Sequence, residues 1–456
     1  MKDIKGIVAA QRAFFASGKT REVSFRRRQL GILRHAVKEN EKSIQEALYA
    51  DLRKSPYEAY MTEIGIVLED IRFYMKNIRR WARPKRVRTP YYHLPATSWI
   101  YPEPYGMALI IAPWNYPFNL AVAPLVPAIS AGNCAVIKPS EFSVSTTEVL
   151  ADLFKRYFDP AYITVVTGGV GTSKALLAEK FDKIFFTGSP AVGRIVMGEA
   201  ARHLTPVTLE LGGKSPCIVE KDADIPLSAK RIVSGKFINA GQTCIAPDYL
   251  AVHHSVRDRL VDEIGKHLHR FFGNNPADSP VYPRIINKKH LERLSGLLEG
   301  TTVIFGGDHD PDTLFFSPTL VTGMALSHPV MQEEIFGPIL PVLTFDTIAE
   351  VIDMVNSRPK PLALYLFTND PGKAKTVMKR ISFGGGCVND TLTHFASPFL
   401  PFGGVGNSGM GSYHGKYGFD SFSHHKGVLK NTFRIDFPFR YPPFFKYLRL
   451  LRKVLR

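Results

Sequence analysis

Apolar residues recur along the chain at two different spacings. Over residues 1–80 they return every three or four positions, for example at Leu30, Leu33 and Val37. This is the period of an amphipathic helix, so we expect residues 1–80 to be helical. From Met107 onward the apolar residues instead form short runs separated by helix-like segments. These runs predict buried strands at 107–112, 135–137, 163–166 and 183–186.

A second series of apolar runs lies further along the chain, at residues 215–219, 249–252 and 362–367. Strands that alternate with helices are typical of parallel sheets with crossover helices. The pattern therefore predicts two α/β domains. Three prolines, Pro84, Pro90 and Pro95, indicate an extended stretch before the first strand.

Composition narrows the class of protein. The chain has 456 residues, of which 45% are hydrophobic and 22% charged, so a mainly disordered chain is excluded. Prolines break the longest apolar stretch and the N-terminal one is short, so neither a membrane span nor a signal peptide is expected. The four cysteines are widely spaced and form no CxxC pair. This spacing argues against a disulfide scaffold or a zinc site, and we expect a cytoplasmic protein without a bound metal.

Charge raises the question of a polyanionic partner. Lys and Arg number 58 against 41 for Asp and Glu, a net charge of +17. Because no nucleic-acid motif accompanies the basic clusters, no nucleic-acid partner is expected. Residues 444–456 carry apolar residues at helical spacing with cations between them. Such a basic amphipathic helix can lie on a membrane surface, or it can pack across a dimer or over a substrate entrance.

Glycine-containing turns offer candidate nucleotide sites. The run Gly404–Gly409 fits GxGxxG, but prolines precede it, so a loop with tight turns is the favoured interpretation. The segment Phe186–Gly193 directly follows a predicted strand and precedes a helix, where backbone N–H groups can hold a pyrophosphate. At another strand end, Lys138 and Glu141 are placed to reach a ribose, where a carboxylate would repel a 2′-phosphate. Spacing equally allows a helix start here, with Ser140 as N-cap.

Three side chains are candidates for covalent catalysis. Cys244 lies on a loop flanked by Gly and Pro and can act as a nucleophile, although a buried structural role is the commoner fate of a cysteine. Glu210 ends an apolar segment at a Gly-Gly turn and can act as a general base on water. Its alternative is a capping or salt-bridged carboxylate. Asn115 offers an amide to an oxyanion, or it closes an Asx turn.

Taken together, these features make the sequence resemble an aldehyde dehydrogenase. Six motifs carry the resemblance over about residues 100–420: PWNYP at 113–117, KPSE at 138–141, FTGS at 186–189, ELGGK at 210–214, GQTC at 241–244 and EIFGP at 334–338. The continuation IAPDY at 245–249 and the glycine-rich region 401–416 are closest to the class 3 branch, which includes fatty and aromatic aldehyde dehydrogenases.

The resemblance implies an α/β, aldehyde dehydrogenase-like fold. It assigns a variant Rossmann cofactor domain to residues 1–83 and 106–211, an α/β catalytic domain to 212–418, a β-arm for oligomerisation to 84–105 and 419–430, and the basic amphipathic tail to 431–456. It also implies a homodimer that binds NAD, with NADP as the second possibility.

The same resemblance implies oxidation of an aldehyde, medium- or long-chain aliphatic or aromatic, to the acid. Cys244 would attack the carbonyl, Asn115 would stabilise the oxyanion, and Glu210 would activate the water that hydrolyses the thioester. A CoA-acylating enzyme is the alternative, against which a hydrolytic base such as Glu210 argues. The implied cofactor-binding residues are Ile111, Ala112, Pro113, Trp114, Lys138, Glu141, Phe186, Thr187, Gly188, Ser189, Val192, Leu211, Glu334 and Phe336.

Overall fold

The apolar runs after Met107 form a six-stranded sheet in a computed structural model, which describes residues 3–444 and 447–454. The strand order is β17 (Gly409–Met410), β7 (Val207–Glu210), β6 (Lys183–Thr187), β3 (Met107–Ile111), β4 (Cys134–Lys138) and β5 (Ile163–Val165). All neighbours are parallel except β17, which runs antiparallel to β7. Because every residue of β3, β4 and β6 is buried, the prediction of buried parallel strands is confirmed here.

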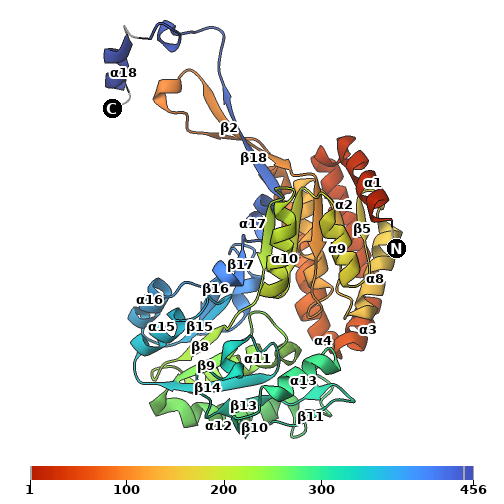
Figure 1. The fold of residues 1–456 in the computed structure, drawn as a ribbon, viewed down its shortest axis with the longest axis vertical. Helices are drawn as coiled ribbons and strands as arrows, with labels where there is room; N and C mark the ends of the chain where they lie inside the picture. Colours follow the sequence, from red (N-terminus) through yellow and green to blue (C-terminus); the bar gives the residue numbers. More distant parts are fainter. Residues whose placement is uncertain (1–2, 445–446, 455–456) are drawn as a thin grey trace.

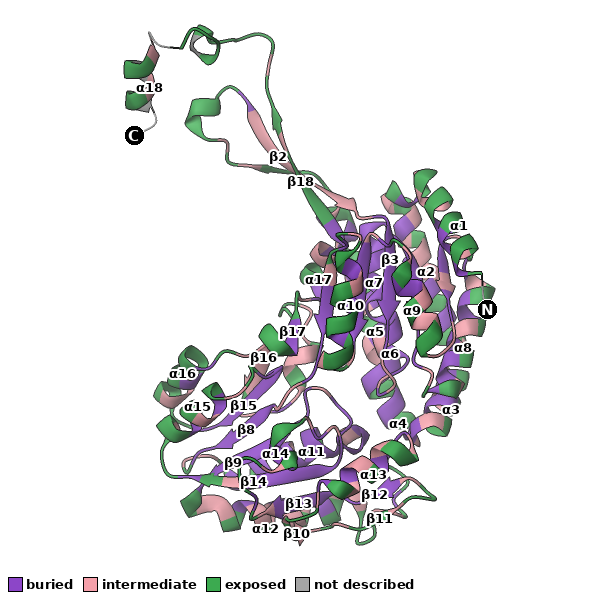
Figure 2. Cartoon of the chain, viewed as in Figure 1, coloured by how far each residue is buried: buried purple, intermediate pink, exposed green. Residues whose placement is uncertain are grey.

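Helices cover both faces of this sheet (Figure 1). The N-terminal ones are α1 (Ile4–Ala16), α2 (Val23–Glu39), α3 (Glu41–Leu52), α4 (Pro56–Ala59) and α5 (Gly65–Trp81), and the others are α6 (Asn119–Val122), α7 (Leu125–Ala131), α8 (Val144–Tyr157), α9 (Val170–Ala178), α10 (Pro190–Ala201) and α17 (Gly415–Ser421). The periodic residues Leu30, Leu33 and Val37 are fully buried in the core, so the predicted helical N-terminal region is confirmed. Figure 2 shows the buried strands and the exposed outer sides of the helices.

The second α/β unit contains a seven-stranded sheet with its own hydrophobic core. Its order is β10 (Thr302–Phe305), β13 (Thr319–Thr322), β14 (Ile339–Phe345), β9 (Tyr249–His253), β8 (Pro216–Val219), β15 (Ala363–Phe367) and β16 (Gly385–Val388). Only the β10–β13 pair is antiparallel. Its helices are α11 (Ile225–Phe237), α12 (Arg257–Phe272), α13 (Lys288–Gly296), α14 (Pro329–Gln332), α15 (Ile348–Asn356) and α16 (Pro371–Arg380). A small hairpin joins β11 (His309–Asp310) to β12 (Phe315–Phe316).

A three-stranded antiparallel arm projects away from both units (Figure 1). It pairs β2 (Thr97–Pro104) with β1 (Lys85–Val87) on one side and with β18 (Ser423–Lys430) on the other. Two stretches far apart in the sequence, within residues 84–105 and 419–430, therefore pair in one sheet. Between the second unit and the arm the chain returns to the first unit, because β17 joins its sheet and Phe419 and Phe422 lie in its core. The domain boundary predicted at 418/419 thus falls inside α17.

The C-terminal tail ends in a short helix, α18 (Leu448–Val454), beyond the arm. Phe445, Lys446, Leu455 and Arg456 of the predicted amphipathic segment lie outside the described residues. Among the described residues, no helix is both long enough and apolar enough to cross a membrane.

Candidate active site

The chain around Cys244 follows α11 in an unusual conformation. Asn239, Ala240 and Gly241 all have positive φ angles, 52°, 50° and 72°. Two of these residues carry side chains, and this conformation is costly for them, so the surrounding contacts must hold it in place. At Gly241 a Cβ atom would lie 2.2 Å from the Gly337 oxygen, so only glycine fits there. This tight turn places Cys244 in the wall of a cavity, where its side chain is half-buried.

This cavity has a volume of about 930 Å³ and collects all three predicted catalytic residues. Asn115 comes from the loop after β3, Glu210 ends β7, and Cys244 follows α11. Residues from both α/β units thus meet where parallel strands end, which is the usual binding edge of such sheets. The alternative interpretation of Cys244, a buried structural cysteine, is therefore wrong. Cys134 and Cys217, by contrast, are structural cysteines that are fully buried in strands.

Asn115 forms hydrogen bonds with Lys54 and with residues 239–244, here called the nucleophile loop, and with none of the described residues next to it in the chain. Its side-chain Nδ2 donates to the Gln242 carbonyl at 2.9 Å, and Gln242 precedes Cys244 by two residues. Its own carbonyl accepts from Lys54 Nζ at 2.9 Å and from Asn239 Nδ2 at 2.8 Å. The alternative of a local Asx turn is wrong, because Asn115 Oδ1, the acceptor in such a turn, has no hydrogen-bond partner among the described residues. An amide carries two N–H donors, and one remains for a ligand in the cavity.

Glu210 is buried, and neither carboxylate oxygen has a hydrogen-bond partner among the described residues. The alternative of a capping or salt-bridged carboxylate is therefore wrong. Burial without a partner raises the pKa of Glu210 well above its ordinary value. A carboxylate with a raised pKa is a stronger base toward water than an ordinary one.

The thiol of Cys244 has its pKa raised to about 12, chiefly by desolvation and then by the carboxylates of Glu334 and Glu210. Burial also raises the pKa of Glu334, to about 8, with Asp248 as the next contribution. Three ionisable groups therefore share one poorly solvated cavity. A positive charge placed among them would favour the ionised thiol.

Eight of the predicted cofactor residues line the same cavity: Pro113, Trp114, Thr187, Gly188, Ser189, Leu211, Glu334 and Phe336. The other six, Ile111, Ala112, Lys138, Glu141, Phe186 and Val192, are not among its lining residues. Lys138 and Glu141 form an ion pair of 2.7 Å at the end of β4. The alternative of a helix start at Ser140 is wrong, because α8 begins at Val144.

The cavity wall has features that fit a dinucleotide. Ser189 is the N-cap of α10, and its Oγ accepts a hydrogen bond from Val192 N at 3.4 Å. The first residues of this helix, Pro190 and Ala191, line the cavity, so backbone N–H groups at the helix start face the space where a pyrophosphate can bind. At Gly188 a Cβ atom would lie 2.6 Å from the Phe186 ring, so a side chain at this position would displace that ring. The Thr187 hydroxyl is buried without a partner among the described residues.

Sequence reasoning did not identify the cationic side chains of the wall. The cavity is also lined by Arg194, Lys214, Arg293, Arg358 and Lys360. Only Lys214 lies within a recognised motif, and the others come from segments without a local signature. Residues 404–408 form a loop with a 3-10 turn at Gly406–Ser408, as predicted, whereas Gly409 begins β17.

Comparisons with known proteins agree with this geometry. The family model for the aldehyde dehydrogenase family matches residues 1–428. A 4,4'-diaponeurosporen-aldehyde dehydrogenase of Staphylococcus aureus is 48% identical over 97% of each chain. A dimeric NADP-preferring aldehyde dehydrogenase of Canis lupus familiaris is 44% identical over 97% of this chain and 98% of the relative. A solved structure described as the substrate-bound state of Staphylococcus aureus AldH superposes with a TM-score of 0.98 at 47% identity, covering all of both chains. The chain belongs to the aldehyde dehydrogenase family.

Proposed function

We propose that Cys244, Asn115 and Glu210 carry out the NAD(P)-dependent oxidation of an aldehyde to its carboxylic acid. The Cys244 thiol gives its proton to water and the thiolate sulfur adds to the carbonyl carbon. The resulting oxyanion accepts hydrogen bonds from Asn115 Nδ2 and the Cys244 backbone N–H. Loss of hydride from the carbon leaves a thioester. Glu210 then removes a proton from water, which adds to the thioester and releases the acid and the Cys244 thiolate. The supporting observation is that these residues, from three separate elements, line one cavity.

When bound, the nicotinamide cofactor supplies the hydride acceptor for this reaction. We assign its binding to the end of β6, the turn after it and the start of α10, with Phe186, Thr187, Gly188, Ser189 and Val192. The ends of β3, β4 and β7 contribute Ile111, Ala112, Pro113, Trp114, Lys138, Glu141 and Leu211. Glu334 and Phe336 complete the set from the second unit. Because Glu141 is partly exposed beside Lys138, it can accept from ribose hydroxyls, and we rank NAD before NADP.

The substrate we propose is a medium- or long-chain aliphatic, or an aromatic, aldehyde. The experiment is NADH formation across a series from acetaldehyde to dodecanal, with benzaldehyde added, each with and without CoA. We expect turnover that grows toward the longer or aromatic members, with the free acid as product in both cases. An acyl-CoA product that appears only with CoA would favour the CoA-acylating alternative, and the absence of NAD(P)H with every aldehyde would contradict the function.

We also propose that the protein is a homodimer joined through the arm. The sheet order leaves β18 as an edge strand over eight residues, and an exposed edge of this length is a ready template for pairing. The arm projects beyond the body of the subunit (Figure 1). Relatives named dimeric are 44% identical to this chain.

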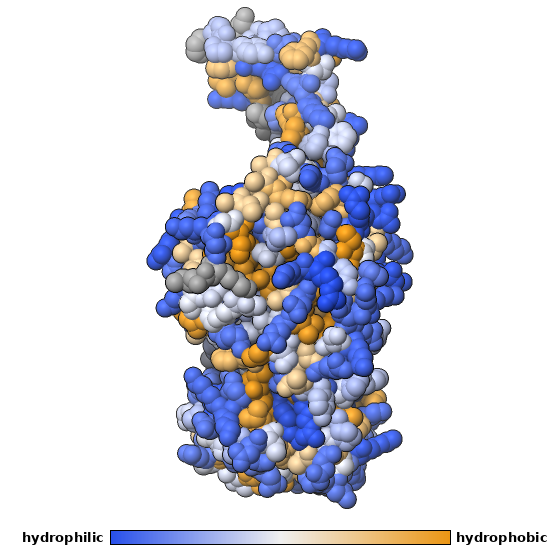
Figure 3. All heavy atoms as spheres, turned by 90° about the vertical axis from the view of Figure 1, so that its right-hand side faces the viewer, coloured by the Kyte–Doolittle hydropathy of each residue, from blue (hydrophilic) through white to orange (hydrophobic). Residues whose placement is uncertain are grey.

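We propose a membrane-surface contact for residues 444–456. Phe444 and Leu448 in this segment are exposed, as are Phe433, Ile435, Phe437 and Tyr441 before it. Figure 3 shows hydrophobic and hydrophilic atoms side by side over this projecting end. Apolar side chains next to cations are the composition that an anionic bilayer surface binds.

Deletion of residues 444–456 is expected to reduce cosedimentation with phosphatidylserine-containing vesicles at least fivefold, since each cation near such a surface contributes about 1 kcal/mol. A variant with Arg449, Arg452 and Lys453 changed to Gln keeps the apolar side chains and is expected to lose most of this binding. Aldehyde turnover in both variants is the control for folding. Unchanged vesicle binding after the deletion would contradict the contact and leave packing against a partner subunit or the substrate entrance as the explanation.

A further inference from the structure

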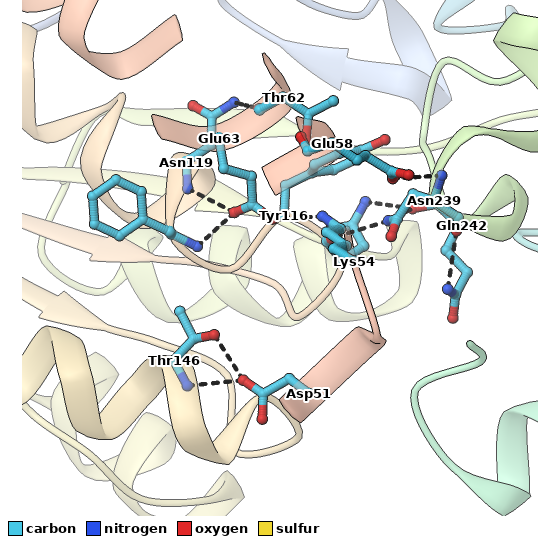
Figure 4. Close-up of polar contacts among 12 residues, drawn as sticks. Asp51, Lys54, Glu58, Thr62, Glu63, Tyr116, Asn119, Thr146, Asn239 and Gln242 are labelled. Carbon is cyan, nitrogen blue, oxygen red and sulfur yellow. Dashed lines mark hydrogen bonds and ion pairs between the residues drawn. The ribbon is translucent and has the colours of Figure 1, made fainter. Parts of the chain in front are cut away.

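A fully buried ion pair lies directly behind the oxyanion residue. Lys54 Nζ is 2.5 Å from Glu63 Oε1, and both side chains have no solvent exposure (Figure 4). The ammonium group also lies 3.9 Å from the centroid of the Tyr116 ring. Desolvation of two charges is costly, and apolar side chains of similar volume often give a fold of equal or greater stability. Stability alone is therefore a poor explanation for this pair.

The remaining hydrogen bonds of the pair converge on one short segment. Glu63 Oε2 accepts from the backbone N–H groups of Phe118 and Asn119, at 2.9 and 3.1 Å. Lys54 Nζ donates to the Asn115 carbonyl at 2.9 Å. The pair thus fixes both ends of the turn that carries the Asn115 side chain.

The nucleophile loop holds the same peptide group from the opposite side. Asn239 Nδ2 donates to the Asn115 carbonyl at 2.8 Å and to the Gln242 carbonyl at 3.1 Å. The backbone N–H of Asn239 donates to Glu58 Oε1 at 2.9 Å, which ties the loop to α4. The Asn115 carbonyl therefore joins the Lys54 ammonium to Asn239 in the turn that leads to Cys244.

The backbone around Glu63 departs from a regular α-helix. Residues Tyr60–Ile64 form one π-helical turn between α4 and α5. A π turn inserts one residue into a helix and shifts the direction of its side chains, and such turns are frequent at functional sites. At Gly65 a Cβ atom would lie 2.9 Å from the Tyr60 carbonyl oxygen, so a larger residue would disturb this turn.

We propose that Lys54 and Glu63 are positioning residues that hold the Asn115 amide in register with Cys244. The inference rests on the proposed function, because it presumes that Asn115 stabilises the oxyanion. Lys54 and Glu63 need no contact with the substrate for this role. They act by keeping the peptide group of Asn115 fixed while negative charge develops at the amide, and such preorganised donors contribute strongly to catalysis.

A double-mutant cycle tests the proposal. Lys54→Met, and the double variant Lys54→Met/Glu63→Gln that removes both charges of the pair, are each made with Asn115 intact and with Asn115→Ala. With Asn115 intact we expect kcat to fall about 10–100-fold for the best aldehyde of the series, with KM changed less than about threefold. In the Asn115→Ala background the same changes are expected to cost less than about threefold, because the group they position is already absent.

Lys183→Met is the matched control, since Lys183 is another buried lysine, bonded to Thr208 Oγ1 at 2.8 Å at the start of β6. It is expected to lower the melting temperature without the selective fall in kcat. Equal losses in both Asn115 backgrounds, or an equal loss in Lys183→Met, would overturn the positioning role and indicate a general effect on the fold. If Lys54→Met does not fold, the charge-free double variant decides the cycle. Failure of the proposed function itself would instead appear as full activity in Cys244→Ala.

Discussion

Replacement of Cys244 by alanine is expected to lower aldehyde-dependent NADH formation by about 10⁴-fold or more, as found when a covalent nucleophile is removed from an enzyme. The reason is chemical, because no other thiol lines the cavity formed by the described residues. Without the sulfur there is no thiohemiacetal from which hydride can leave and no thioester for water to hydrolyse.

The measurement is steady-state NADH formation with the best aldehyde of the series, together with the melting temperature and the affinity for NAD. Cys387→Ala is the matched control, since Cys387 is also half-buried but lies on β16, where its sulfur is 3.5 Å from His394 Nδ1. We expect this control to retain turnover within about threefold, as is usual for substitutions away from a site. Undiminished turnover in Cys244→Ala, or an equal loss in Cys387→Ala, would contradict the assignment of the nucleophile.

The sequence predicted the fold wherever local pattern decides structure. Residues 107–112, for example, are an unbroken apolar run between breakers, and β3 forms there because a strand covered on both faces favours such a run. The return of the chain to the first unit through β17 and α17 was not predicted. Gly409 and Met410 pair with Glu210 and Leu209, nearly 200 positions earlier, and no local pattern encodes that pairing.

The same distinction between local pattern and tertiary contact applies to the residues of the active site. Cys244, Glu210 and Asn115 lie in or beside recognisable motifs, so the sequence alone suggested them as catalytic candidates, and the structure places them around one cavity. Lys54 and Glu63 were missed because a lysine and a glutamate in an N-terminal helical region are expected on the solvent face. Their burial depends on a π turn and on contacts with residues 115–119, which only the folded chain reveals.

Replacement of Glu210 by glutamine is expected to separate hydride transfer from thioester hydrolysis. Glutamine keeps the shape of the side chain but cannot accept the proton from water. A first turnover of NADH should therefore form at a rate near that of the native enzyme, followed by a steady state slower by about 10²–10⁴-fold, the usual contribution of a general base. Stopped-flow absorbance and mass spectrometry of the acylated protein measure the two phases.

The pH dependence gives this prediction a second readout. The Glu210 pKa is raised by burial, and only the ionised carboxylate acts as base, so native kcat should rise with pH as Glu210 loses its proton and level off above its pKa. Glu210→Gln should lose this limb of the profile. Glu210→Asp, which retains a carboxyl group at a shorter reach, should keep the limb at a lower rate. An equal fall of the first NADH turnover and of the steady state in Glu210→Gln would mean that Glu210 acts before hydride transfer, and a thioester would then not accumulate on Cys244.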